Sequence, residues 1–196
     1  MVSFPGFRIE TDSLGSKEIP AEALYGIHSV RAKENFPDQT PFHIEWYKAL
    51  GVVKLSCYKA YSSFCHAVKD KRPGISLPFE LLETNILEAM DYAATSIAKG
   101  EHFDSFIVPA ISGGAGTSIN MNVNEIIANL ALAGLGLPYG NYERIDPIEA
   151  ANIYQSTNDV VPTALKVAVI QLLAELEQSV NALRQRIEGL ESKYSN

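Results

Sequence analysis

Apolar residues recur every three or four positions in four stretches of this 196-residue chain, and this spacing predicts amphipathic helices. The first apolar stripe runs from Trp46 to Val68. Thr40 and Pro41 are typical of an N-cap and a first helical position, so we expect the helix to begin there. The sequence DKRPG, residues 70–74, predicts its end.

The next two stripes predict helices that are separated by a loop. The second helix is expected to begin near Pro78 and to stop at Gly100, because glycine is the residue type that most often follows a helix. Residues 101–112 predict a loop or a short extended piece. The third helix then follows a glycine-rich segment and ends in AGLGLPYG, residues 133–140.

The fourth helix is expected from about Asn158 to the last few residues. It would be roughly 35 residues or about 50 Å long, several times the length of a typical globular helix. Its apolar stripe continues almost to the end of the sequence. Because a long amphipathic helix must bury its apolar face, we expect that subunits form a bundle and that the chain is the front part of a longer protein.

The N-terminal part is less regular. Residues 8–40 mix short β-like pieces with Gly and Pro turns, which predicts at most a small hairpin and one helical turn around residues 25–35. The expected fold class is therefore mainly α, with a small N-terminal α(+β) domain.

Composition and charge limit the classes of binding partner that the chain could have. The chain is 46% hydrophobic, which is ordinary for a globular protein, and its net charge of −7 includes no Lys/Arg run. This balance disfavours nucleic acids and anionic membrane surfaces. No apolar run approaches the roughly 18 residues of a membrane span, and residues 1–12 lack the layout of a signal peptide. We therefore expect a cytoplasmic protein with no nucleic-acid or membrane partner.

Cysteine and histidine positions argue against a disulfide and a metal site. Cys57 and Cys65 lie in one predicted helix, about 12 Å apart along its axis, so we expect reduced, buried thiols. The four histidines are His28, His43, His66 and His102. They show no metal-ligand spacing, so we expect no bound metal.

The segment SGGAGTSINMNVNEIIANLAL, residues 112–132, places many uncharged donors at the start of the third predicted helix. A helix N-terminus offers free N–H groups and partial positive charge, and glycines let a ligand approach the backbone. Thr117, Ser118, Asn120 and Asn122 add hydroxyl and amide donors, a setting that suits a small carboxylate. The segment lacks the lysine of a phosphate loop and the third glycine of a dinucleotide loop. The alternative is a glycine turn whose Thr or Ser only caps the helix.

A second donor cluster precedes the fourth predicted helix. Ser156, Thr157 and Asn158 are followed by Asp159 and Pro162. Three consecutive donor side chains are more than one cap needs, although one of them could cap the helix while the others face solvent. Our hypothesis is that the two polar helix starts converge on one anionic ligand.

These segments resemble a known family. GGAGTSINMNVNEIIAN and QSTNDVVPTALKVAV resemble two signature regions of the aspartase/fumarase superfamily, and RIETDSLG and IPAEALYGIHSVRAKENFP are similar to its opening. The resemblance covers nearly the whole chain, in the family's order. The forms GGAGTS and QSTND favour the aspartate ammonia-lyases over the fumarases, which more often carry a GSGTQSN-like loop and QSSND.

The resemblance implies reversible deamination of L-aspartate to fumarate and ammonia without an organic cofactor. A base removes a proton next to the β-carboxylate, charge accumulates there as an aci-carboxylate, and the amine leaves. Such chemistry needs donors aimed at the developing charge. By motif position, Thr117, Ser156 and Thr157 would bind substrate carboxylates, with Ser118 a weaker candidate. Asn158 would contact the substrate near its amino group.

Two family regions do not occur in the 196 residues: a Thr-His segment, and a GSSxMPxKxNP loop that supplies the catalytic Ser base. We therefore expect an N-terminal fragment with no catalytic residue of its own and no activity alone. The resemblance also implies a homotetramer whose active sites join three subunits. It divides the chain into an N-terminal domain, residues 1–151, and the truncated start of a central helical bundle, residues 152–196.

Some positions depart from the family pattern and leave the substrate open. Asp146-Pro147-Ile148-Glu149 stands where many members read His-Pro-Asn-Asp, so we do not expect the second anion site that this loop forms in fumarases. Ser112 replaces a common Gln, and Val160-Val161 replaces a pair that usually includes an aromatic residue. The alternatives are a fumarase-like lyase acting on malate and a non-catalytic helical assembly module, which the unburied stripe would also fit.

Overall fold

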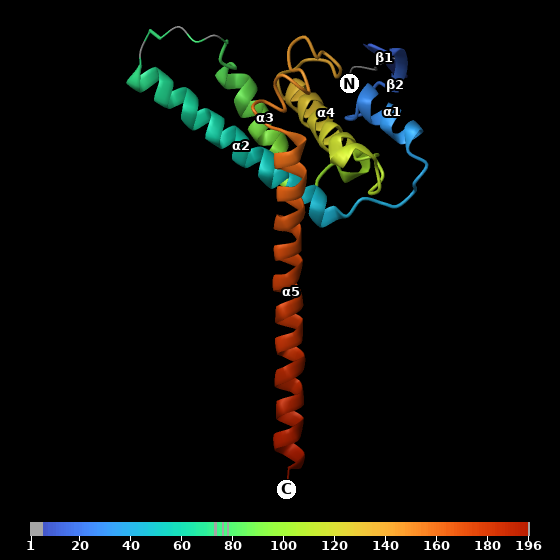
Figure 1. Ribbon diagram of the computed structural model, residues 1–196, viewed down its shortest axis with the longest axis vertical. Helices are drawn as coiled ribbons and strands as arrows, with labels where there is room; N and C mark the ends of the chain where they lie inside the picture. Colours follow the sequence, from blue (N-terminus) through green and yellow to red (C-terminus); the bar gives the residue numbers. More distant parts are fainter. Residues whose placement is uncertain (1–5, 73, 76, 78, 196) are drawn as a thin grey trace.

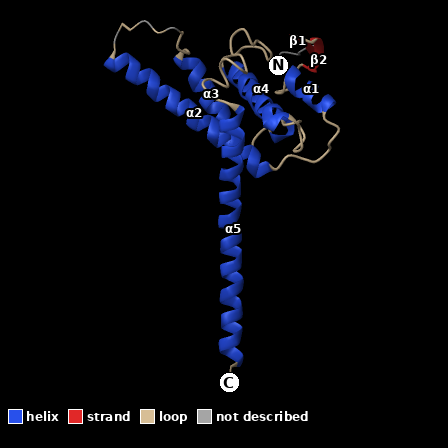
Figure 2. Cartoon of the chain, viewed as in Figure 1, coloured by secondary structure: helices blue, strands red, loops and turns tan. Residues whose placement is uncertain are grey.

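The computed structural model describes residues 6–72, 74, 75, 77 and 79–195. Within this range the chain has a hairpin and five α-helices (Figures 1 and 2). The elements are β1 (Phe7–Asp12), β2 (Gly15–Pro20), α1 (Ile27–Asn35), α2 (Ile44–Lys71), α3 (Thr84–Ala98), α4 (Thr117–Gly134) and α5 (Thr157–Tyr194). The hairpin and α1–α4 form a head, from which α5 extends as a single rod (Figure 1). The mainly α fold class is thus confirmed.

The N-terminal hairpin is small, as predicted. β1 and β2 pair antiparallel, from Phe7 opposite Pro20 to Asp12 opposite Gly15. The helix that follows, α1, has 9 residues, so it is longer than the single turn expected from the sequence.

α2 begins at Ile44, so the start predicted at Thr40 and Pro41 is wrong. The N-cap is His43, whose Nδ1 accepts a hydrogen bond from the Glu45 amide at 3.2 Å. The Thr40 hydroxyl donates to Asp38 at 3.0 Å, and the Thr40 carbonyl accepts from the Ala110 amide at 3.0 Å. These bonds hold Thr40 against the loop before α4 and leave it outside the helix. α2 ends at Lys71, as the pattern predicts.

α3 begins at Thr84 rather than near Pro78, which itself lies outside the described residues. The Leu82 amide donates to the hydroxyl of Tyr61 on α2 at 3.0 Å, so the segment before α3 runs over α2 without helical bonds. The predicted stop is correct: α3 ends at Ala98, and Gly100 has a φ of +86°.

The core of the head lies where α2 packs against α3 and α5, and α3 packs against α4. α2 and α3 come closest at Gly51, where a Cβ atom would lie 2.4 Å from the Ala98 nitrogen. Only glycine allows this approach. The thiols of Cys57 and Cys65 are free. Cys65 is buried, as expected, whereas Cys57 is only partly buried.

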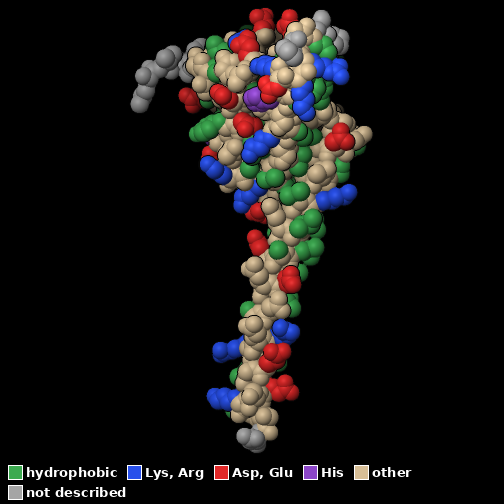
Figure 3. All heavy atoms as spheres, turned by 90° about the vertical axis from the view of Figure 1, so that its left-hand side faces the viewer, with side chains coloured by type: hydrophobic (Ala, Val, Ile, Leu, Met, Phe, Trp, Pro, Cys, Tyr) green, Lys and Arg blue, Asp and Glu red, His purple; other side chains and the backbone are tan. Residues whose placement is uncertain are grey.

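α5 has 38 residues, and only its first turns are buried, at Val160, Val161, Ala164 and Ala168. From Val169 to Ser195 every residue is exposed. Apolar side chains nevertheless continue down the rod (Figure 3). We call one face of them the α5 stripe: Leu165, Val169, Leu172, Leu176, Val180, Leu183, Ile187 and Leu190. None of the described helices is both long and apolar enough to cross a membrane.

Candidate functional site

The structure brings the two polar helix starts together. The Asn120 amide of α4 donates to Thr157 Oγ1 of α5 at 3.4 Å. One turn earlier, Gly116 lies against Val161 so closely that a Cβ atom on it would be 2.8 Å from Val161 Cγ1. Gly116 also has a φ of +87°, a left-handed conformation that glycine adopts without strain. Val160 and Val161, which depart from the family pattern, are buried in this packing.

At the start of α5, two hydroxyl groups keep a hydrogen that can point outward. Ser156 Oγ accepts from the Asn158 amide at 3.1 Å and so caps the helix. Thr157 Oγ1 accepts from Asn120. Because a hydroxyl has one hydrogen and two lone pairs, accepting these bonds leaves each hydrogen free for a ligand. The Asn158 side chain is exposed beside them.

At the start of α4 the polar groups are arranged differently. The Thr117 hydroxyl donates to the Gly114 carbonyl at 2.8 Å, so its hydrogen is already used. Ser118 is partly buried next to it. The N-cap of α4 is Gly116, which provides no side-chain cap, and the Thr117 amide donates to the Gly114 carbonyl. The backbone donors of this helix start are therefore the amides that follow Thr117.

Thr117 and Ser118 line a cavity of about 630 Å³ between α1 and α4. His28, Arg31 and Met121 also line it, whereas Ser156–Asn158 are not among its lining residues. The cavity therefore joins two of the predicted donors with two basic side chains, and the other three donors lie at the adjoining helix start. The sequence assigned no role to His28 and did not single out Arg31. Their spacing of three residues on one short helix could have indicated that the two side chains share a face.

Arg31 is held by an acidic neighbour. Its Nε and a terminal nitrogen donate to the two carboxylate oxygens of Asp12 at 2.6 and 2.8 Å. The guanidinium lowers the pKa of Asp12. This pair fixes the direction of the Arg31 side chain at the mouth of the hairpin.

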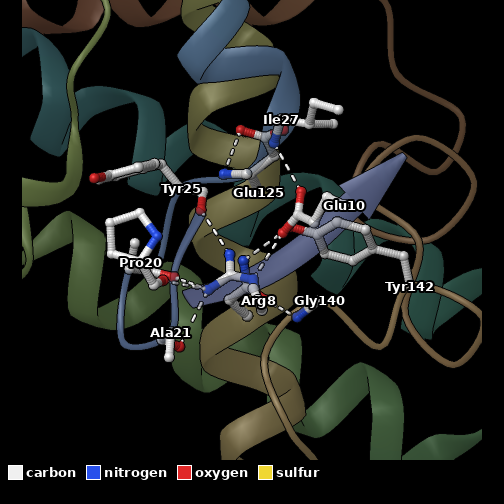
Figure 4. A network of polar contacts seen from close by, with 12 residues as sticks. Arg8, Glu10, Pro20, Ala21, Tyr25, Ile27, Glu125, Gly140 and Tyr142 are labelled. Atoms are coloured by element: carbon white, nitrogen blue, oxygen red, sulfur yellow. Dashed lines mark hydrogen bonds and ion pairs between the residues drawn. The ribbon is translucent and has the colours of Figure 1, made fainter. Parts of the chain in front are cut away.

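α1, which carries His28 and Arg31, is anchored by a carboxylate from α4 (Figure 4). Glu125 is fully buried and accepts from the amides of Gly26 at 2.8 Å and His28 at 2.9 Å, as well as from the amide and hydroxyl of Ser29. Gly26, the N-cap of α1, has no capping side chain, so Glu125 takes over that function from another helix. Burial raises the pKa of Glu125.

A second carboxylate completes the anchor. Glu10 of β1 accepts from the Ile27 amide at 2.7 Å, from Arg8 Nε at 2.8 Å and from the Tyr142 hydroxyl at 3.2 Å. Arg8 also donates to the backbone carbonyl of Tyr25 at 2.8 Å (Figure 4). Hairpin, α1 and α4 are thereby fixed as one unit around the cavity.

A buried polar cluster lies below the start of α5. Lys54 Nζ donates to Asn152 Oδ1 at 2.9 Å, and Asn120 Nδ2 donates to the same oxygen at 3.0 Å. Asn152 Nδ2 donates to the Gln155 carbonyl at 3.0 Å. Burial lowers the pKa of Lys54 to about 7. Sequence reasoning missed Lys54, although a lysine one turn after Leu50 and one before Tyr58 interrupts the apolar face of that helix.

The loop before α5 is acidic. Asp146 Oδ1 accepts from the amides of Ile148 at 2.6 Å and Glu149 at 2.9 Å. Asp146 also lines a second cavity of about 460 Å³, together with Glu10, Glu143 and His28. Three carboxylates disfavour an anion in this cavity. Within the described ranges, no group of three or more His, Cys, Asp or Glu side chains is arranged to hold a metal ion.

Comparisons with known proteins point to one family. The model of a lyase family matches residues 15–196. Aspartate ammonia-lyase from a Bacillus species is 42% identical over 91% of this chain and 35% of its own length. The enzyme of that name from Bacillus subtilis is 37% identical over 95% and 37%, and that from Escherichia coli K12 is 35% identical over 95% and 36%. The chain thus spans little more than a third of these relatives.

Solved structures give the same result. A fumarate lyase:delta crystallin from Brucella melitensis superposes with a TM-score of 0.85 at 34% identity, over 97% of this chain and 41% of that one. A class II fumarase from Schistosoma mansoni superposes with a TM-score of 0.66 at 25% identity, over 83% and 32%.

Proposed function

Because the chain belongs to the lyase family whose model matches residues 15–196, we propose that it is part of an aspartate ammonia-lyase. The reaction would interconvert L-aspartate with fumarate and ammonia and would need no organic cofactor. The observation that carries this proposal is the meeting of the α4 and α5 starts, where Asn120 contacts Thr157. Two helix N-termini and several neutral donors at one place suit a carboxylate whose charge grows during the reaction.

The residue roles follow from the hydrogen bonds already made. Ser156 and Thr157, whose hydroxyl hydrogens are free, would donate to the carboxylate oxygens. Thr117 and, less directly, Ser118 would line the substrate site at the start of α4. The Thr117 hydroxyl already donates to Gly114, so Thr117 would contribute a contact and not a hydrogen bond to the carboxylate. Asn158 would contact the substrate near its amino group.

We further propose the family's assembly for this protein. The α5 stripe, exposed over its full length, supports a homo-oligomer, a tetramer in the complete enzyme, in which α5 lies in a central helical bundle. The head, residues 1–151, would then be one domain, and residues 152–196 would belong to the bundle. A cytoplasmic location fits the composition.

The catalytic base is not assigned to any residue of this chain. The segment GSSxMPxKxNP, which supplies the Ser base in the family that the sequence resembles, does not occur in these 196 residues. We therefore expect the 196-residue chain alone to release no fumarate from L-aspartate. Measurable turnover by this chain would contradict that assignment.

The test is fumarate release, followed by its ultraviolet absorbance, from L-aspartate and L-malate side by side. The protein is the full product of the gene that encodes these residues. Release from L-aspartate alone supports the proposal. Release from L-malate alone would favour the fumarase-like alternative, for which the Schistosoma mansoni structure is the supporting observation. Release from neither would contradict both and favour a helical assembly module built on α5.

A further inference from the structure

α2 holds the chain around the start of α5 by three polar side chains. The Tyr58 hydroxyl donates to the Ala151 carbonyl at 2.5 Å, and Trp46 Nε1 donates to the Val161 carbonyl at 3.3 Å. Between them, Lys54 Nζ donates to Asn152 Oδ1 at 2.9 Å. The first two bonds fix the backbone on either side of the donor cluster Ser156–Asn158, and the third fixes a side chain directly behind it.

Asn152 transmits the position of Lys54 to the donor cluster. Its oxygen accepts from Lys54 and Asn120, and its nitrogen donates to the Gln155 carbonyl at 3.0 Å. Both ends of the carboxamide are therefore engaged, and the group cannot rotate without losing bonds at each end. Because Gln155 directly precedes Ser156, the orientation of Asn152 sets where the chain enters the first turn of α5.

The buried position of Lys54 costs folding free energy unless its charge serves a function. The residue is fully buried, and burying an ammonium group is unfavourable without an ionic partner. None of the ion pairs formed by the described residues includes Lys54. An apolar side chain of similar length would pack between α2 and α5 without this penalty.

The titratable groups around Lys54 leave its charge largely uncompensated. Cys57, the neighbour on α2, is kept neutral because burial raises the pKa of its thiol. Tyr58 on α2 is likewise held neutral, since burial raises the pKa of its hydroxyl. The carboxylate of Asp159 on α5 raises the pKa of Cys57 further, and the carboxylate of Asp91 on α3 does the same for Tyr58.

We propose that Lys54 is a positioning residue of the donor cluster: its Nζ orients Asn152, which fixes Gln155, so that Ser156–Asn158 point at a bound dicarboxylate. The ammonium also places positive charge behind these donors, where it favours an anion. The inference rests on the proposed function only for the nature of that anion. Lys54 touches neither the ligand nor the reacting atoms.

The proposal has a pH signature. Burial lowers the pKa of Lys54 to about 7, so the group loses its proton near neutral pH while an exposed lysine stays charged. A charged donor makes a stronger hydrogen bond than a neutral one. As the pH rises through about 7, the hold on Asn152 weakens and the affinity for a dicarboxylate falls.

The experiment is a pH titration of the ¹⁵N-labelled 196-residue chain by NMR, with and without fumarate. We expect the amide signals of Gln155, Thr157 and Asn158 to shift in one step centred near pH 7. Lys54→Met should abolish the step, and Lys59→Met, the same change at an exposed position of α2, should retain it. Fumarate should bind several-fold more tightly at pH 6 than at pH 8 in the wild type and equally at both in Lys54→Met.

The outcomes separate this role from the proposed function. A step that Lys54→Met removes, without any response of the 196-residue chain to fumarate, supports the role of Lys54, and fumarate release by the full gene product then decides the proposed function. A response to fumarate with no step, or with a step that survives in Lys54→Met, overturns the role and supports the function. If Lys54→Met does not fold, the wild-type titration decides, because the absence of a step near pH 7 overturns the proposal.

Discussion

At the scale of single residues, the hydroxyl groups of Thr157 and Thr117 make opposite hydrogen bonds. Thr157 accepts from Asn120 and keeps its hydrogen for a ligand, whereas Thr117 donates its hydrogen to Gly114. We therefore predict that Thr157→Val in the full gene product lowers kcat/KM for L-aspartate by about 10²-fold, as expected for a lost transition-state donor. Thr117→Val should lower it by less than about 10-fold, since the Thr117 hydroxyl hydrogen is bonded to Gly114 and is not offered to the substrate.

Steady-state kinetics of purified variants checks this order. Ser179→Ala is the control, because Ser179 is an exposed residue of α5 whose hydroxyl donates to the Glu175 carbonyl. Its kcat/KM should equal that of the wild type. Equal losses in Thr157→Val and Thr117→Val would contradict the distinction between the two hydroxyls.

The sequence predicts which residues of the candidate site are donors, because Ser, Thr and Asn at a helix start are visible as a local pattern. It does not predict which hydroxyl keeps its hydrogen, because that depends on Asn120, a residue of another helix. The buried polar cluster around Lys54 and Asn152 cannot be predicted from the sequence for the same reason. Lys54 and Asn152 lie far apart in the chain and acquire their roles only when α2 packs against α5.

At the scale of elements, the interiors of the helices follow the apolar spacing, and the errors concentrate at two starts. Local capping rules place the start of α2 at Thr40, but the bond between Thr40 and Ala110 keeps that residue in a loop. The start of α3 is displaced to Thr84 because Tyr61 holds Leu82 in a non-helical segment. Both corrections come from contacts between distant parts of the chain, which no local rule contains.

The contact between α4 and α5 depends on glycine, which has no side chain, at position 116. Gly116 has a φ of +87°, and an added Cβ atom would lie 2.8 Å from Val161. We predict that Gly116→Ala lowers the free energy of unfolding by about 3 kcal/mol, from backbone strain and from displacement of Val161. Urea denaturation followed by circular dichroism measures the change.

Gly136→Ala is the matched control. Gly136 has a similar φ of +73°, but an added Cβ atom would meet no atom within 4 Å. The control should therefore lose only the cost of a left-handed alanine, about 1 kcal/mol. If both variants lose the same stability, the packing of Gly116 against Val161 contributes nothing.

At the scale of the whole molecule, the chain consists of a packed head and a rod whose apolar side chains have nothing in the described chain to cover them (Figure 3). The 38 residues of α5 extend for about 57 Å. The side chains of Leu176 and Leu183 are 58% and 61% exposed. Water contact along such a face is unfavourable, so the stripe is the surface through which copies of this chain would associate.

We predict that the 196-residue chain self-associates in analytical ultracentrifugation and that Leu176→Glu with Leu183→Glu shifts it to monomers. Each carboxylate would have to be buried without a partner in a bundle, so association should weaken at least 10²-fold. Gln178→Glu with Gln185→Glu adds the same charge on the opposite face of α5 and should leave association unchanged. Because α5 is exposed from Val169 onward, neither pair of changes alters the packing of the head. Equal weakening by both pairs would show that net charge, and not the stripe, governs assembly.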